Sequence, residues 1–169
     1  MRFIGAVLLT MAASAMGYFK SKELKSQAST LYETISLLEL VRNEICTRRT
    51  PLIQIFEGSN LPEYRYISQF IYDIRAGLSE LGGKSFTYMW CECTDKRLYY
   101  LNERNRQTVK NLGSSLGKYD AELQAAAIDR CISELTAEYG TLNAGLKSNE
   151  KMYIGLGTGI GLIFSIILV

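Results

Sequence analysis

The chain has 169 residues with 19 basic and 17 acidic side chains, a length that allows one domain or at most two small ones. Residues 20–151 hold 18 of the basic and all 17 acidic residues, a net charge of +1, which argues against binding of nucleic acid because a clear basic excess is missing. The chain has no histidine and no nucleophile or nucleotide-binding motif, so we expect neither an enzyme nor a cofactor.

The first element is an apolar segment, 3–19, of 17 residues without a charge. A helix of that length reaches roughly 26 Å, within the range of membrane-spanning segments. An alternative interpretation is a secretory signal peptide, because Arg2, the apolar run and the Ala-Ser-Ala at 13–15 resemble a cleavable leader. The apolar run continues directly into a helical pattern, so we favour a retained transmembrane helix over 1–19.

The next pattern predicts a long amphipathic helix. Apolar residues recur every three or four positions from Leu24 to Ile45. Pro51 ends this pattern, since proline lacks the backbone donor and disfavours helix at the residue before it. A further helix is predicted to begin with Asn60 as its N-cap and to end at Gly82, where two glycines follow one another.

Two shorter helical patterns follow, and one of them contains Trp90. The other runs from Leu98 to Leu116, in one or two pieces, and is predicted to end at Gly117. Asp120 is a typical N-cap residue for a new helix. The chain is therefore expected to reverse direction between Gly117 and Asp120.

The last pattern is the longest. Apolar residues step by three or four from Ile128 to Leu146 and lead into 152–169, which is 18 residues without a charge. This seam predicts pairing with the first long helix as an antiparallel coiled-coil-like stalk, and 152–169 predicts a second transmembrane helix. Four glycines there would let another helix approach closely: Gly155, Gly157, Gly159 and Gly161. The alternative is that they have no packing role, since glycine is common in membrane helices.

Lysines flank both apolar segments on the side of the middle region, at positions 20, 22 and 25 and again at 147 and 151. The positive-inside rule places 20–151 in the cytoplasm and both termini outside. We therefore expect an all-α protein of the cell membrane, in which transmembrane helices 1–19 and 152–169 flank a cytoplasmic helical bundle, 20–151. The alternative is an exported helical protein with a cleaved signal peptide and a C-terminal membrane anchor.

A basic set lies in the middle region and consists of Arg97, Arg104, Arg106 and Lys110. It could dock an acidic partner or anionic lipid headgroups. An ordinary solvated helix face is an equally good interpretation.

Four cysteines occur, at 46, 91, 93 and 131. Structural zinc sites usually show pairs of cysteines two to four residues apart, whereas here one pair is separated by a single residue. A cytoplasmic location also argues against disulfides. We therefore expect small buried hydrophobic residues and no metal.

Several short pieces of the chain are typical of one protein family. They are Pro51, the helix of Trp90, Gly113, Leu116, Gly117, Asp120, Gln124, Lys151, Met152 and Gly157. In their order and spacing the chain resembles the stage III sporulation protein AB family, which is itself similar to the F-type inner-membrane platform of type II secretion and type IV pilus systems.

The resemblance implies a membrane platform or scaffold in a secretion-like channel complex between mother cell and forespore. It also implies a cytoplasmic partner, the ATPase of the stage III sporulation protein AA type, together with other channel components and membrane lipid. The middle domain would lie on the mother-cell side. The resemblance does not decide whether the chain forms a homo-oligomer.

Overall fold

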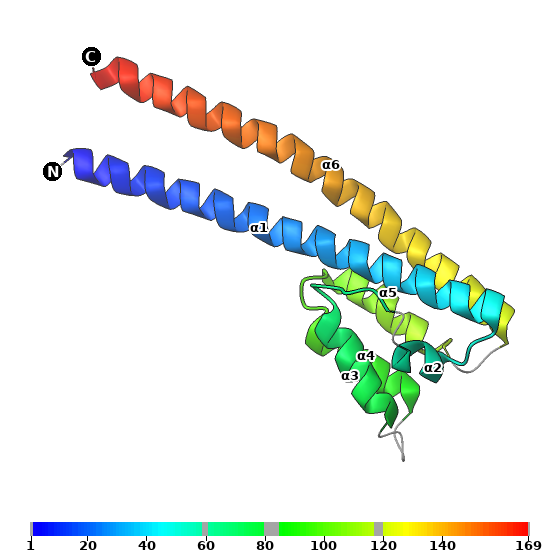
Figure 1. The fold of residues 1–169 in the computed structure, drawn as a ribbon. Coiled ribbons are helices and arrows are strands. Elements are labelled where there is room, and N and C mark those ends of the chain that lie inside the picture. Colours follow the sequence, from blue (N-terminus) through cyan, green and yellow to red (C-terminus); the bar gives the residue numbers. More distant parts are fainter. Residues whose placement is uncertain (1, 59–60, 80–84, 117–119, 169) are drawn as a thin grey trace. The chain divides into compact units, whose positions relative to one another are not determined.

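The computed structural model describes residues 2–58, 61–79, 85–116 and 120–168, and side chains only between residues 19 and 146 (Figure 1). Every regular element in these ranges is helical, so the predicted all-α class is confirmed. The elements are α1 (Arg2–Asn43), the π-helical turn η1 (Glu44–Arg48), α2 (Leu52–Glu57), α3 (Ser68–Ser79), α4 (Phe86–Arg97), α5 (Glu103–Gly113) and α6 (Ala121–Leu168).

The chain divides into two compact units. Unit 1 comprises residues 1–25 and 140–169, and unit 2 comprises 26–139. Within the described part of the chain, no helix combines the length and the apolar character needed to span a bilayer. The side chains of 3–18 and 152–168, including the four glycines predicted to pack there, lie outside the described part, so the two membrane helices remain predictions.

Within unit 2, α1 and α6 run antiparallel. Arg42 Nε lies 2.5 Å from Asp129 Oδ1, and the Tyr32 ring lies 6.0 Å from that of Tyr139. The predicted apolar stripes face inward, and these members are at most 1% exposed: Leu31, Leu38, Val41, Ile128 and Leu135. The predicted antiparallel pair is confirmed for the parts of both helices that belong to unit 2.

The shorter helices of unit 2 meet around Trp90. Its ring is 1% exposed and lies 6.3 Å from Phe56 of α2, 5.2 Å from Phe70 of α3 and 5.8 Å from Phe86 of α4, between ring centroids. The indole Nε1 donates a 2.7 Å hydrogen bond to the carbonyl oxygen of Val109 in α5. Because buried aromatic rings remove large apolar areas from water, this cluster ties the four helices together.

One predicted helix start is wrong. The helix expected from Asn60, which itself lies outside the described residues, begins only at Ser68. The carboxylate of Glu33 in α1 accepts hydrogen bonds from the three backbone N–H groups of 65–67, at 3.2, 2.7 and 3.1 Å. A side chain from a distant helix thus satisfies backbone donors ahead of α3, where a local cap had been expected.

The helix expected from Leu98 to Gly117 is also shorter than predicted. It begins after Asn102, whose side chain accepts a 2.8 Å hydrogen bond from the backbone of Asn105, and it ends at Gly113. Leu98 is fully buried, but it lies in the link before α5. Its apolar side chain therefore indicates that the residue is buried, and does not indicate that it belongs to a helix. Gly117 and the two glycines at 82 and 83 lie outside the described residues, and the short helix α2 was not predicted.

Candidate functional site: a groove beside Pro51 and Asp120

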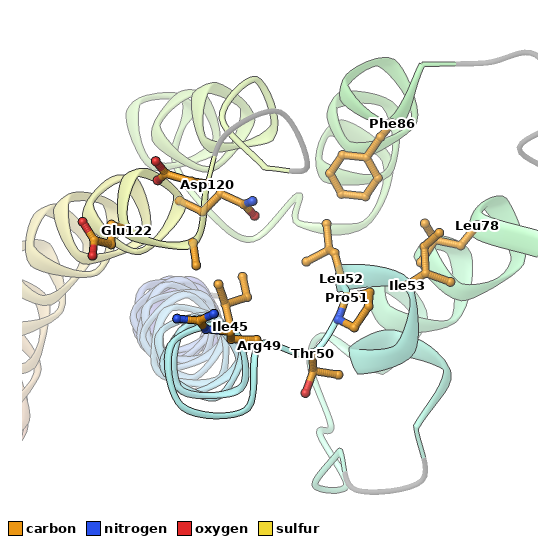
Figure 2. A pocket seen from close by; sticks show the side chains of 12 residues that line it. Ile45, Arg49, Thr50, Pro51, Leu52, Ile53, Leu78, Phe86, Asp120 and Glu122 are labelled. Carbon is orange, nitrogen blue, oxygen red and sulfur yellow. The ribbon is translucent and has the colours of Figure 1, made fainter.

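A half-open groove of about 820 Å³ lies in unit 2 (Figure 2). One wall is the link between η1 and α2, and the other is the first turn of α6. Apolar side chains line part of it, namely Ile45, Leu52, Ile53, Leu78 and Phe86. The polar lining consists of Arg49, Thr50, Asp120, Glu122 and Gln124. The groove is therefore apolar on one side and carries charges of both signs.

The first wall is shaped by the way α1 ends. The backbone N–H and the hydroxyl of Thr50 donate to Glu44, at 3.2 Å to its carbonyl oxygen and 3.1 Å to its carboxylate. Arg49 closes the turn in the left-handed conformation, with φ 51° and ψ 33°. Among the described residues it is the only non-glycine with a positive φ. Glycine normally occupies this position after a helix, because other residues lose about 1–2 kcal/mol there.

The second wall is the capped start of α6. Asp120 Oδ1 accepts a 2.9 Å hydrogen bond from the backbone N–H of Leu123, so the predicted N-cap is confirmed. Glu122 follows in the first turn, where the positive end of the helix dipole stabilises a negative charge. Leu123 does not point into the core and is 55% exposed.

Phe86 connects the groove to the aromatic cluster, since it lines the groove and contacts Trp90. Trp90 in turn packs directly on Gly113. A Cβ atom at Gly113 would lie 2.4 Å from Trp90 Cδ1 and 2.8 Å from Cγ. Thr87 Oγ1 also donates a 3.1 Å hydrogen bond to the carbonyl oxygen of Gly113. Only glycine fits this contact without a shift of the indole.

The structure divides the motif residues into groups. Pro51, Asp120 and Gln124 line the groove. Trp90, Gly113 and Leu116 are buried in unit 2. The remaining members lie outside the described residues or have undescribed side chains: Gly117, Lys151, Met152 and Gly157.

Three lining residues were not predicted from the sequence, namely Arg49, Ile53 and Glu122, and neither was the exposure of Leu123, which follows Glu122 in the chain. Leu123 carried a usable signal, because it is an apolar residue three positions after the N-cap Asp120 and off the seam that starts at Ile128. The positive φ of Arg49 has no signature in the sequence.

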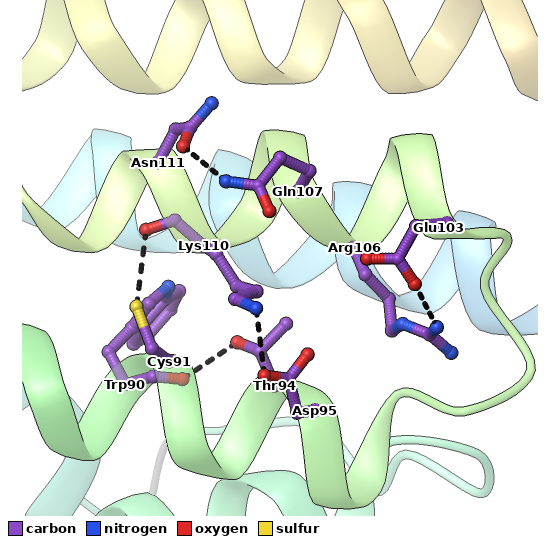
Figure 3. A network of polar contacts seen from close by, with 9 residues as sticks. All are labelled: Trp90, Cys91, Thr94, Asp95, Glu103, Arg106, Gln107, Lys110 and Asn111. Atoms are coloured by element: carbon purple, nitrogen blue, oxygen red, sulfur yellow. Dashed lines mark hydrogen bonds and ion pairs between the residues drawn. The ribbon is translucent and has the colours of Figure 1, made fainter.

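The predicted basic set is largely neutralised by neighbouring carboxylates (Figure 3). Lys110 Nζ lies 2.8 Å from Asp95 Oδ2, and this contact raises the pKa of Lys110. Arg106 forms an ion pair with Glu103 and is half-buried. Both cations therefore offer less charge to a partner than the sequence suggested.

Arg97 is paired in the same way. Its Nε and Nη2 atoms donate to the two carboxylate oxygens of Asp73 at 2.7 and 3.1 Å. The bidentate contact holds the pKa of the Asp73 carboxyl below its usual range. Arg104 is exposed, and within the described residues it makes no ion pair.

The cysteines only partly fit the expectation of buried hydrophobic residues. All four are free, and burial raises the pKa of Cys93 to about 11 and that of Cys131 to about 12. Cys91 is half-buried and Cys46, on the outside of η1, is exposed. No cluster of three or more potential metal ligands occurs among the residues whose placement is described.

Comparison with known proteins gives a match at the level of the family. The family model for stage III sporulation protein AB matches residues 2–169. No curated protein and no solved structure matches the chain. The family match covers the groove, the aromatic cluster and both apolar ends of the sequence. The chain therefore belongs to the stage III sporulation protein AB family.

Proposed function

We propose that this sporulation protein is a non-enzymatic membrane platform in a secretion-like channel complex between mother cell and forespore. In this role it docks an ATPase of the stage III sporulation protein AA type on its cytoplasmic side and contacts other channel components. The observation that carries the proposal is the family match over residues 2–169. The charge-free segments 3–19 and 152–169, with lysines on their inner flanks, support a membrane location.

The topology can be tested with the native cysteines. Cys46 is exposed in unit 2, whereas Cys93 and Cys131 are buried and their raised pKa values leave little reactive thiolate at neutral pH. A maleimide that cannot cross membranes should therefore leave Cys46 unlabelled in intact sporulating cells and label it after permeabilisation. The matched control is Cys46→Ser, which should lose that signal.

The exported alternative makes the opposite prediction for the same reagent. Labelling of Cys46 in intact cells would refute the cytoplasmic platform and support a cleaved leader with a C-terminal anchor. A cysteine added after Val169 in the Cys46→Ser background gives the second readout, since the proposed hairpin exposes that position outside.

Docking of the ATPase is tested at Arg104. The other three members of the basic set already contact carboxylates. Replacing Arg104 with Glu should therefore remove most of any salt-dependent part of the binding free energy. Calorimetry with the full chain in detergent and the purified ATPase should show an affinity loss that shrinks as salt rises. Arg130→Glu on α6, which is also exposed but already pairs with Glu134, is the control. Equal affinities at every salt concentration would remove this surface from the interface.

A further inference from the structure

Three charged side chains line the groove. Asp120 accepts the cap hydrogen bond from Leu123, whereas the other two have no side-chain partner within the described part of unit 2. Arg49 and Glu122 both line it and are exposed, and neither makes an ion pair or side-chain hydrogen bond within the described residues. Arg49 also holds a backbone conformation that a glycine would adopt at lower cost. Strained residues persist where the surroundings or a function require them.

Apolar side chains are also exposed in this groove and next to it along the chain. Ile53 is 45% exposed and lines the groove, and Leu123 is 55% exposed next to Glu122. Single exposed apolar residues are ordinary. Here, however, Ile53 lines a groove whose surface includes Leu52 and Phe86. Leu123 lies in the chain between two lining residues, Glu122 and Gln124, so exposed apolar side chains occur both in the groove and directly beside it.

We propose that this groove is the contact surface for a second copy of the same chain. In a two-fold interface one patch meets itself, so each feature must find its complement on the same patch. Leu123 of each copy would insert beside Ile53 of the other, and Glu122 of each would pair with Arg49 of the other. One set of four residues thus supplies two apolar contacts and two ion pairs.

Charge complementarity favours a second copy over a different protein. A surface for an acidic or a basic partner would carry mainly the opposite sign. Apart from Asp120, whose carboxylate caps α6, this groove presents on opposite walls a cation and a carboxylate that have no partner among the described residues. This is the pattern expected of a self-complementary patch. The proposal depends on unit 2 alone and does not rest on the platform function.

Charge reversal tests the proposal on the full chain in detergent. Sedimentation equilibrium in density-matched detergent gives the dimer dissociation constant of wild type, Arg49→Glu, Glu122→Arg and an equimolar mixture of the two variants. Each reversal places like charges opposite one another twice, so each should weaken the dimer at least about tenfold. In the mixture both contacts again join opposite charges, so association should return to near the wild-type constant.

Two further variants separate contact from folding. Arg49→Gly removes the charge and suits the left-handed backbone, so it should weaken the dimer without lowering the thermal midpoint. Arg104→Glu makes the same charge change at an exposed arginine away from the groove and should leave the dimer unchanged.

Three results would overturn the proposal. One is a wild-type chain that stays monomeric at about 100 µM, a concentration well above the dissociation constants of specific dimers, which would leave the groove to another protein. Another is a mixture that associates no better than its components. The third is a dimer whose dissociation constant is unchanged by both reversals but which dissociates with Gly157→Ile. That result would assign the association to the last apolar segment.

Discussion

Replacing Gly113 with alanine tests whether the packing of Trp90 on α5 holds unit 2 together. The added Cβ would lie 2.4 Å from Trp90 Cδ1, far inside ordinary contact distance. The indole cannot move freely, because it is 1% exposed, is surrounded by three phenylalanine rings and donates a hydrogen bond to Val109. Either the indole shifts and strains this bond, or α5 moves away from α4.

The expected cost follows from two opposing effects. Overpacking a core typically costs about 1–3 kcal/mol. Alanine is better than glycine inside a helix by up to about 1 kcal/mol, but Gly113 is the last residue of α5, so this gain is smaller. The net destabilisation should be about 1–2 kcal/mol, which for a chain of 169 residues lowers the thermal midpoint by about 2–8 °C.

The chain contains a single tryptophan, so its fluorescence reports on this contact directly. Thermal unfolding of the full chain in detergent, followed by circular dichroism and by Trp90 emission, should show the lower midpoint and a shifted spectrum. Gly140→Ala is the control, since a Cβ there meets nothing within 4 Å and should keep or raise the midpoint. A wild-type midpoint and an unchanged spectrum for Gly113→Ala would refute the reasoning.

Three other substitutions test separate parts of unit 2. Glu33→Gln weakens the charge-assisted hydrogen bonds to the backbone ahead of α3. It should lower the free energy of unfolding, measured in urea, by about 1–3 kcal/mol. The control is Glu39→Gln, an exposed position on the same helix, which should change this free energy by less than about 0.5 kcal/mol. Arg97 lowers the pKa of Asp73 in the folded state. The Asp73 carboxylate therefore stabilises the fold above its unfolded pKa of about 3.9 and loses this effect as the pH falls through the folded pKa. The difference in unfolding free energy between wild type and Asp73→Asn should have its largest value near pH 7 and disappear in acid. Arg49→Gly should raise the thermal midpoint, by the equivalent of about 1 kcal/mol, because glycine adopts a positive φ without strain; a fall would contradict the left-handed geometry.

The parts of the fold that the sequence predicted well depend on local repeats. An amphipathic helix shows its buried stripe at a spacing of three and four whatever packs against it, so the inward faces of α1 and α6 were predicted in the right places. The Asp120 cap was also predictable, since its hydrogen bond reaches only to Leu123. Both signals lie within a few residues of the structure that they specify.

The errors occur where a distant residue replaces a local signal. The backbone donors ahead of α3 are satisfied by Glu33, more than 30 positions earlier, and no local cap pattern can reveal this. The charge that Arg97 offers was overestimated for the same reason, because its partner Asp73 lies 24 residues earlier in the chain. A list of charges in one segment says little about the charge that the folded surface presents.

The groove combines both situations, which determines how it must be probed. Its two walls are built by local signals, a proline after a helix end and a capped helix start, but only the tertiary fold brings them together. Phe86 belongs both to the groove and to the cluster around Trp90, so truncating the apolar lining would loosen the core and the surface at once. Arg49 and Glu122 are exposed and make no ion pair or side-chain hydrogen bond in the described structure, so changing their charge leaves that core intact. Reversing each charge alone, and mixing the two variants, therefore tests binding at the groove separately from the packing that stabilises unit 2.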